Sequence, residues 1–592
     1  RAAAVALSPF RRQAATEAQD RLEGEPQHSH LSIMACMRLL AVIVPAIASA
    51  NDAWSCPALP PAGVAQDSMQ HAKRPQLLHP FSFVNGKKSE WSGETDIVSS
   101  PVYDNTDGKR MEIGKLPRMS EEDAVSAVNA AASAWDRGQG EWPQMSLAAR
   151  IAAIEAVCEE LQSIRDEIVN VLMWEIAKNT EDSVKEFDRT MDFVAAAIRE
   201  IKSDPTIRQG FDFADWREVS GTLVRVRRGP IGVMLALAPF NYPLNEMYAM
   251  LIPSLLMGNT AVLKIPAVGG LVHTLTADAF AKHLPPGVIN FVSGSGRKTM
   301  GPIMATGLVD VLGFIGGSKA ADALIKAHPQ PHRLKVFAQL EGKNLGIVMP
   351  DADLDVAAAQ CTLGATSYNG QRCTAIKLIM VHEAVADAFV ERLAKRIAAL
   401  KVGLPWEEGV AITPLPEEKK PKYLEELIAD ALEKGAVLRN ADRGGGTLRG
   451  ALMTPALVDL VTPQMRLFQE EQFGPVVPVA RFSDLSQVTD ALKASWNGQQ
   501  AALFTSEAAA IASLVDALSS VVGRININAQ CGRSPDVVPF SGRRSSAMGT
   551  MSVTEALRAF SIETVIAASA KDKVATKVAK GLSEHSAFLA PI

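Results

Sequence analysis

The sequence predicts an α/β protein built on more than one mostly parallel sheet. From about residue 223 onward, short apolar runs alternate with longer amphipathic segments, as in parallel strands connected by helices. This alternation stops near Lys335 and then begins again, which indicates a second α/β domain. A chain of 592 residues is long enough for several domains, each with its own core.

Composition and charge argue against several classes of protein. A hydrophobic content of 47% and a charged content of 21% are ordinary for a globular chain. The net charge of −5, without a basic stripe, gives no sign of nucleic-acid binding. The six cysteines have no CxxC spacing and the ten histidines no HExxH spacing, so we expect neither a disulfide framework nor a metal site.

Residues 1–76 are expected to form an N-terminal extension outside the fold. Within it, residues 34–50 have a charged start, a short apolar run and an Ala-Ser-Ala end, the layout of a secretory signal peptide. A chance apolar patch is the alternative. If the segment is a signal, we expect a secretory or plastid route; otherwise the cytoplasm is the expected compartment.

The folded part is expected to begin near Phe81 and to open with a layer of helices. Ser120 and Asp123 form a capping-box pattern before an Ala-rich helix that ends near Trp135, with Asp in place of the usual Glu or Gln. Further helices are predicted over 146–166, 168–177 and 180–201.

Strands and helices then alternate through two domains. Residues 223–228 alternate apolar and polar side chains, as in a half-buried strand, and 231–238 read as a strand buried on both faces. Other strands are predicted over 261–264, 289–292, 311–315, 345–349, 376–381 and 561–568, and helices over 244–257, 271–282 and 385–399, with Asp351 and Asp353 capping a helix. Residues 441–450 are expected to form a flexible loop without helix or strand.

One cysteine stands out by its neighbours. Cys373 follows a polar Gly-containing turn and precedes the strand predicted over 376–381. Arg372 beside it would favour the thiolate, the nucleophilic form of the side chain. A buried structural cysteine is the alternative, although the polar turn argues against burial in a core.

A series of motifs at successive strand ends carries a family resemblance. In this order, the motifs resemble those of the aldehyde dehydrogenase superfamily over about residues 81–568, most closely its non-phosphorylating NADP-dependent glyceraldehyde-3-phosphate dehydrogenases. They are Pro239–Pro243 (PFNYP), Leu263–Pro266 (LKIP), Gly294–Gly296 (GSG), Phe314–Ser318 (FIGGS), Leu340–Lys343 (LEGK), Gly370–Cys373 (GQRC) and Glu470–Pro475 (EEQFGP).

The resemblance implies a domain plan. It implies a Rossmann-type cofactor-binding domain over 77–344, which includes oligomerisation strands at about 207–230, and an α/β catalytic domain over 345–545. Residues 546–592 would supply a C-terminal oligomerisation strand and tail. The family also implies a homodimer or homotetramer, without a nucleic-acid or membrane partner.

The resemblance also implies a mechanism. Cys373 matches the nucleophile that attacks the aldehyde carbonyl, and Asn241 the side chain that stabilises the oxyanion together with the backbone N–H of Cys373. The family's general base falls on Gln339, which cannot accept a proton, while Glu341 stands two residues later. Three outcomes are possible for deacylation. Glu341 reaches in as the base, or water is activated without this carboxylate and deacylation is slow, or the acyl group passes to another nucleophile. Alternatively, Glu341 only caps a helix or pairs with Lys343.

Cofactor and substrate positions follow from the same resemblance. The cofactor would contact Lys264, Gly296, Gly316, Ser318, Glu471 and Phe473, and Ala267 leaves room for a 2′-phosphate, so NADP is expected and NAD is possible. Arg189, Tyr242, Arg372 and Arg533 match positions that hold a substrate phosphate.

These matches predict oxidation of glyceraldehyde 3-phosphate to 3-phosphoglycerate with reduction of NADP. A semialdehyde or broad-range aldehyde dehydrogenase is the alternative in the same class. A non-catalytic binding or structural protein on this fold is the alternative in another class, because Gln339 replaces the usual base.

Overall fold

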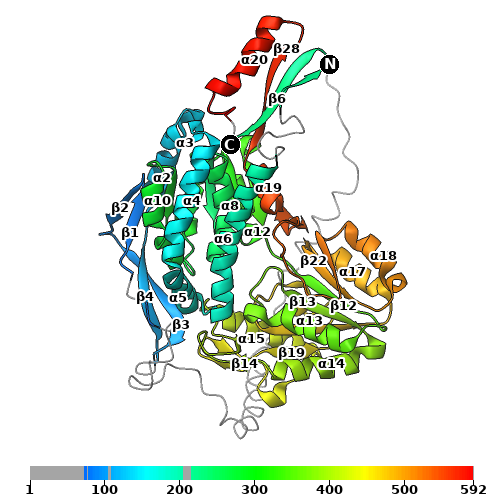
Figure 1. Ribbon diagram of the computed structural model, residues 1–592. Helices are drawn as coiled ribbons and strands as arrows, with labels where there is room; N and C mark the ends of the chain where they lie inside the picture. Colours follow the sequence, from blue (N-terminus) through cyan, green and yellow to red (C-terminus); the bar gives the residue numbers. More distant parts are fainter. Residues whose placement is uncertain (1–72, 76–77, 105–107, 205–214, 591–592) are drawn as a thin grey trace, which may run out of the picture. The chain divides into compact units, whose positions relative to one another are not determined.

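The computed structural model describes residues 73–75, 78–104, 108–204 and 215–590 (Figure 1). The candidate signal segment at 34–50 lies outside these residues. None of the described helices is both long enough and apolar enough to cross a membrane.

The first large sheet has its strands in the order β26-β11-β10-β7-β8-β9. Its strands are β7 (Val233–Leu237), β8 (Thr260–Lys264), β9 (Ile289–Val292), β10 (Val311–Ile315), β11 (Lys335–Gln339) and the antiparallel β26 (Ala547–Met548). The chain runs from β7 to β8 and β9 on one side, then returns to place β10 and β11 on the other. The crevice between β7 and β10 is therefore the topological switch point, where open α/β sheets bind their ligands.

Helices cover both faces of this sheet because its apolar side chains alternate between the two faces. Met234 and Ala236 of β7 share a core with α8 (Pro243–Leu256), whereas Val233 and Leu235 share another with α2 (Glu121–Trp135). The other helices of this part are α3 (Glu141–Gln144), α4 (Leu147–Ser163), α5 (Arg165–Ile176), α6 (Thr180–Ser203), α9 (Leu271–Thr274), α10 (Ala277–His283), α11 (Gly296–Ala305), α12 (Ser318–Ala327) and α19 (Val553–Ala559).

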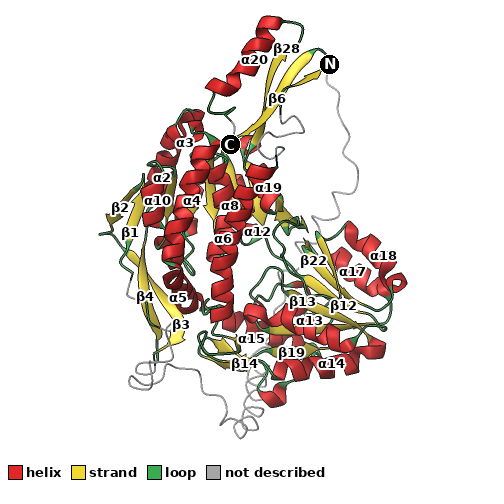
Figure 2. Ribbon diagram, viewed as in Figure 1, coloured by secondary structure: helices red, strands yellow, loops and turns green. Residues whose placement is uncertain are grey.

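The second large sheet has the order β16-β19-β20-β13-β12-β22-β23, and only β16 is antiparallel to its neighbour. Its strands are β12 (Asn344–Val348), β13 (Ile376–His382), β16 (Val437–Leu438), β19 (Ala456–Asp459), β20 (Val476–Phe482), β22 (Gln500–Phe504) and β23 (Arg524–Ile527). Its helices are α13 (Leu354–Thr366), α14 (Glu383–Ala398), α15 (Lys420–Glu433), α17 (Leu485–Ala494) and α18 (Ala508–Ser519). Figure 2 shows the helices packed against this sheet.

A smaller antiparallel sheet joins distant parts of the chain. It contains β5 (Arg217–Val219), β6 (Thr222–Gly229) and β28 (Ile562–Ser569), with Ile562 opposite Gly229. The helix α20 (Lys573–His585) follows β28, where the sequence predicted only an Ala/Lys-rich end (Figure 1).

Several predicted details are right at the level of single residues. Ser120 and Asp123 form the reciprocal capping box of α2, and Asp353 caps α13. The strands predicted over 289–292 and 311–315 have the observed bounds.

Other details differ from the prediction. Two hairpins precede the first helix: β1 (Phe81–Val84) with β2 (Lys87–Glu90), and β3 (Thr95–Tyr103) with β4 (Arg110–Pro117). The predicted helix over 271–282 is divided into α9 and α10, where the Thr274 and Thr276 hydroxyls bond to backbone carbonyls of the first turn. The expected loop at 441–450 contains a 3₁₀ turn at Ala441–Arg443 and strand β17 (Leu448–Arg449), which pairs with β18 (Leu452–Met453).

Candidate active site

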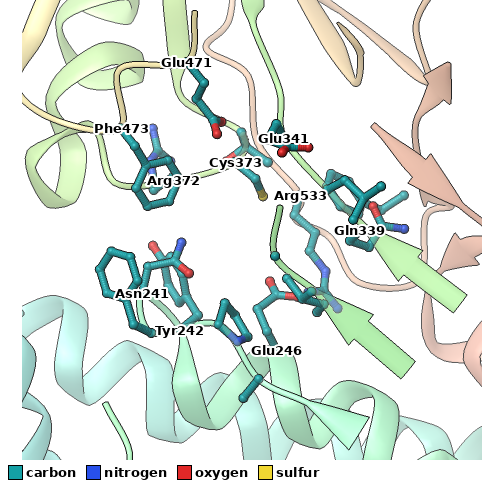
Figure 3. Close-up of a pocket in the computed structure, with 18 of the residues that line it drawn as sticks. Asn241, Tyr242, Glu246, Gln339, Glu341, Arg372, Cys373, Glu471, Phe473 and Arg533 are labelled. Carbon is teal, nitrogen blue, oxygen red and sulfur yellow. The ribbon is translucent and has the colours of Figure 1, made fainter. Parts of the chain in front are cut away.

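A cavity of about 810 Å³ lies at the switch point of the first sheet. It is lined by the segments that follow β7, β10 and β11 and by the turn that precedes β13. Most of the predicted site residues meet here (Figure 3): Arg189, Asn241, Tyr242, Gly316, Gln339, Glu341, Arg372, Cys373, Glu471, Phe473 and Arg533. Lys264, Gly296 and Ser318 are not part of its lining.

The turn that carries Cys373 is held in place through its backbone carbonyl groups. The Asn344 side chain at the start of β12 donates from Nδ2 to the carbonyl oxygens of Cys373 at 2.7 Å and Ala375 at 2.9 Å. A Cβ atom at Gly342 would lie 2.8 Å from the same Cys373 oxygen, so this approach requires glycine. The thiol is thus fixed relative to both β12 and β13.

The charge environment of Cys373 differs from the prediction. Burial raises the pKa of the thiol, and the Glu246 carboxylate raises it further, while Lys377 and a hydrogen bond with Gln499 lower it. Arg372 instead directs Nη2 to the carbonyl oxygen of Gly364 at 3.0 Å. Lys377 is thus the cation named as lowering the pKa of the thiol, a role that the sequence assigned to Arg372.

Asn241 lies at the end of β7 beside the thiol turn. Its Nδ2 atom donates to the carbonyl oxygen of Gln371 at 2.8 Å, and its own carbonyl oxygen accepts from Lys178 at 2.6 Å. An amide nitrogen carries two protons, so a second one is available for an oxygen bound next to Cys373.

The two candidates for the base position differ in their surroundings. Gln339, at the end of β11, is buried, and neither atom of its amide has a hydrogen-bond partner within the described part of the chain. The Glu341 Oε1 atom accepts from the backbone N–H of Ser318 at 2.7 Å and from its hydroxyl at 3.2 Å. Glu341 therefore caps α12, one of the alternatives that the sequence left open.

Two of the predicted cofactor residues, Glu471 and Phe473, also line the cavity. Glu471 forms an ion pair with Lys377 and accepts from the N–H of Gly342 at 3.1 Å. The Phe473 ring packs edge to face against Phe240, with 5.8 Å between the ring centroids.

These residues fit a dinucleotide. A pyrophosphate at the N-terminus of α12 would take the place of Glu341, which accepts from the Ser318 N–H here; the N-cap residue, Gly317, has no side chain of its own. Gly296 begins α11, and Lys264 ends β8 with its ammonium bonded to the carbonyl oxygen of Ile265 at 2.5 Å. Burial lowers the pKa of Lys264 to about 8.

The predicted phosphate residues form a network with carboxylates. Arg189 makes a bidentate contact with Asp536, at 2.8 and 2.6 Å. Arg533 lies 3.2 Å from Asp536 and 2.6 Å from the Oε2 atom of Glu246. Tyr242 lies under the ammonium of Lys178, 3.6 Å from the ring centroid.

Sequence reasoning missed Glu246, Lys377 and the buried pair Lys178–Glu186. Glu246 did carry a signal, since it is the one charged residue in the apolar stretch 243–256. It is also the only residue of α8 that is not buried. Lys377 and Lys178 stand in ordinary strand and loop contexts, and only the fold brings them to the site.

Comparison with known proteins gives consistent matches. Residues 94–566 match the model of the aldehyde dehydrogenase family. The NADP-dependent glyceraldehyde-3-phosphate dehydrogenase of Streptococcus equinus is 34% identical over 482 residues, 81% of this chain and 96% of the relative. The enzyme of that name from Pisum sativum is 33% identical over 474 residues, 79% of this chain and 91% of the relative.

A solved structure agrees with these matches. The NADP-dependent glyceraldehyde-3-phosphate dehydrogenase of Bacillus halodurans, crystallised with NADP, superposes with a TM-score of 0.74 at 32% identity. The match covers 83% of this chain and 99% of that one.

Proposed function

Because the chain belongs to the aldehyde dehydrogenase family, we propose that it oxidises glyceraldehyde 3-phosphate to 3-phosphoglycerate and reduces NADP. The observation that carries the proposal is the cavity that contains Cys373, Asn241 and four arginines. The relatives named for this reaction, which match along four fifths of the chain, support the same conclusion.

The residues account for the first half of the reaction. The Cys373 sulfur attacks the aldehyde carbon, and its S–C bond forms as the carbonyl oxygen becomes an oxyanion. The backbone N–H of Cys373 and the free amide proton of Asn241 donate to this oxygen; one such donor lowers a barrier by roughly 3–4 kcal/mol in other enzymes. NADP, held by Lys264, Glu471 and Phe473, would supply the hydride acceptor, and loss of the hydride from the tetrahedral adduct would leave a thioester on Cys373.

The arginines account for a phosphorylated substrate. Arg189 and Arg533 contact the carboxylates of Asp536 and Glu246, and Arg372 and Arg524 line the same cavity, so the arginines outnumber these two carboxylates. A phosphate group carries the opposite charge, and its oxygens match the forked donors of a guanidinium group. Tyr242 contributes a hydroxyl at the same end of the cavity.

The neutral segment after β8 supports the choice of NADP. Ala267 and Val268 line the cavity, and no carboxylate in 265–271 would repel a 2′-phosphate. Lys264 would hold the adenosine ribose with its phosphate, and Glu471 and Phe473 would hold the nicotinamide end.

The small sheet supports assembly into a homo-oligomer. Val565 of β28 and Val574 and Val578 of α20 are 61%, 71% and 60% exposed. Apolar side chains gathered on one strand and the adjoining helix suit a surface that another copy of the chain covers.

The test is NADPH formation from glyceraldehyde 3-phosphate without inorganic phosphate, with succinic semialdehyde as the competing substrate. We expect a higher kcat/KM for the phosphorylated aldehyde, and loss of all turnover in Cys373→Ser. Equal kcat/KM values, or an Arg533→Met variant with an unchanged preference, would contradict the phosphate assignment.

A further inference from the structure

We propose that Glu246 is the general base that activates water to hydrolyse the thioester on Cys373, with Gln339 orienting that water. This inference rests on the proposed function, because it concerns the second half of the same reaction. It answers a chemical need: the position expected to supply the base holds an amide, which cannot accept a proton at neutral pH.

Four carboxylates line the described cavity, and three are engaged elsewhere. Glu341 bonds the N-terminus of α12, Glu471 pairs with Lys377 and bonds Gly342, and Glu417 lies 3.6 Å from Lys420. Glu246 remains. It enters the cavity from the first turn of α8, five residues after Asn241.

Glu246 faces the thiol. Figure 3 shows its carboxylate directed into the cavity toward the sulfur of Cys373, beside Arg533. Its charge acts on the thiol more strongly than that of any other side chain. We place the attacking water between this carboxylate and the sulfur, because both line the same cavity.

The Arg533 contact leaves the carboxylate able to accept a proton. Although the Arg533 Nη1 atom lies 2.6 Å from the Oε2 atom of Glu246, neither Nη1 nor Nη2 makes an aligned hydrogen bond within the described residues. Arg533 therefore holds the carboxylate by charge, and the carboxylate itself lines the cavity.

Gln339 supplies the second contact for the water. Its amide is 3% exposed and lines the same cavity, and within the described residues both amide atoms are unpartnered. An unpaired buried amide is unfavourable unless a water or ligand completes it. A water bonded there would be held while Glu246 takes its proton.

The step balances as follows. The water oxygen forms a bond to the thioester carbon as one of its protons passes to Glu246. The tetrahedral intermediate then expels the Cys373 thiolate as the C–S bond breaks, and the acid product and Glu246 each release a proton to solvent.

An ester assay tests this step without a cofactor. p-Nitrophenyl acetate acylates a reactive thiol directly, so a burst of nitrophenolate reports acylation and the steady rate reports hydrolysis of acetyl-Cys373. We expect Glu246→Gln to keep the burst and to lose roughly 100-fold or more of the steady rate, since general bases contribute 10²–10⁴-fold. Intact mass should show one acetyl group on the variant.

Rescue and a matched control sharpen the result. In the Glu246→Gln background, Gln339→Glu should restore the steady rate, because it places a carboxylate on the same water. Glu417→Gln, which changes another cavity carboxylate, should behave as the wild type. Wild-type turnover in Glu246→Gln would overturn the assignment of Glu246 as the base. Accumulation of the acyl-enzyme in Glu341→Gln, but not in Glu246→Gln, would overturn it as well.

The same variants separate the two proposals. A wild type that hydrolyses the ester but forms no NADPH from glyceraldehyde 3-phosphate contradicts the proposed function alone. A wild type that forms NADPH, with an equally fast Glu246→Gln variant, contradicts the role of Glu246 alone.

Discussion

The buried ion pair between Lys178 and Glu186 offers a sharp test of how the site is supported. Both side chains are 0% exposed. Lys178 donates to the Asn241 carbonyl oxygen, and Glu186 accepts from the backbone N–H groups of Leu244 at 3.0 Å and Asn245 at 3.3 Å. The pair therefore ties α6 to the segment that carries Asn241 and to the first turn of α8.

The change to make is Lys178→Met, which removes the cation and leaves the Glu186 carboxylate buried. Breaking a buried pair in this way costs about 3–5 kcal/mol. The two backbone donors remain on Glu186, so we expect the low end, about 3 kcal/mol. The double variant Lys178→Met with Glu186→Gln leaves no buried charge and should cost only about 1 kcal/mol, about 2 kcal/mol less than the single variant.

The single variant should also acquire a pH dependence. Burial raises the pKa of Glu186, and Lys178 opposes that rise. Without Lys178 the folded protein binds a proton at Glu186 that the unfolded chain releases, so stability should increase as pH falls from 8 toward 5. The double variant has no such group and should show no added slope.

Urea unfolding followed by tryptophan fluorescence measures both effects, because Trp174 is fully buried in the same core. The burst amplitude with p-nitrophenyl acetate reports whether Asn241 and Cys373 keep their places. A double variant as unstable as Lys178→Met, at every pH, would refute the argument, since the loss would then come from packing and not from an unpaired charge.

Two further outcomes follow from the charges around the site. Glu246→Gln should lower the pKa of Cys373 and speed the alkylation of this thiol by iodoacetamide at pH 7, whereas Lys377→Met should raise the pKa and slow the alkylation. Each rate should change by up to roughly tenfold per pKa unit. Alkylation rates that change in the same direction in both variants would contradict the assigned causes. Lys264 loses its charge as pH rises through about 8, so NADP should bind roughly tenfold more weakly at pH 9 than at pH 7. In Lys264→Met, the NADP affinity measured by calorimetry should be the same at both pH values.

The sequence was most informative where local chemistry decides structure. The capping box of Ser120 and Asp123, and the apolar strands of the two parallel sheets, are set by neighbouring residues or by burial on both faces. The hairpin β3–β4 was missed because Pro101 and register shifts interrupt its alternation. The pair β17–β18 was missed because its strands have only two residues each.

For the site, the order of the motifs identified residues that the fold brings into one cavity. It did not show which charged side chains lie next to the Cys373 thiol. Arg372 is adjacent to Cys373 in sequence yet directs its guanidinium to the Gly364 carbonyl, while Lys377, four residues later, lies near the thiol. Sequence adjacency does not fix side-chain direction, because the turn before β13 sends neighbouring side chains to different sides.

The position of Glu246 explains why its role and the choice of substrate are linked. A carboxylate that projects from a helix otherwise buried needs a cationic partner, and Arg533 supplies it. Arg533 also lies against Asp536, which in turn holds Arg189. The carboxylate that would activate water and the arginines that would bind phosphate therefore form one network. A negatively charged substrate that takes donors from Arg533 would leave the Glu246 carboxylate freer to accept the proton of the hydrolytic water.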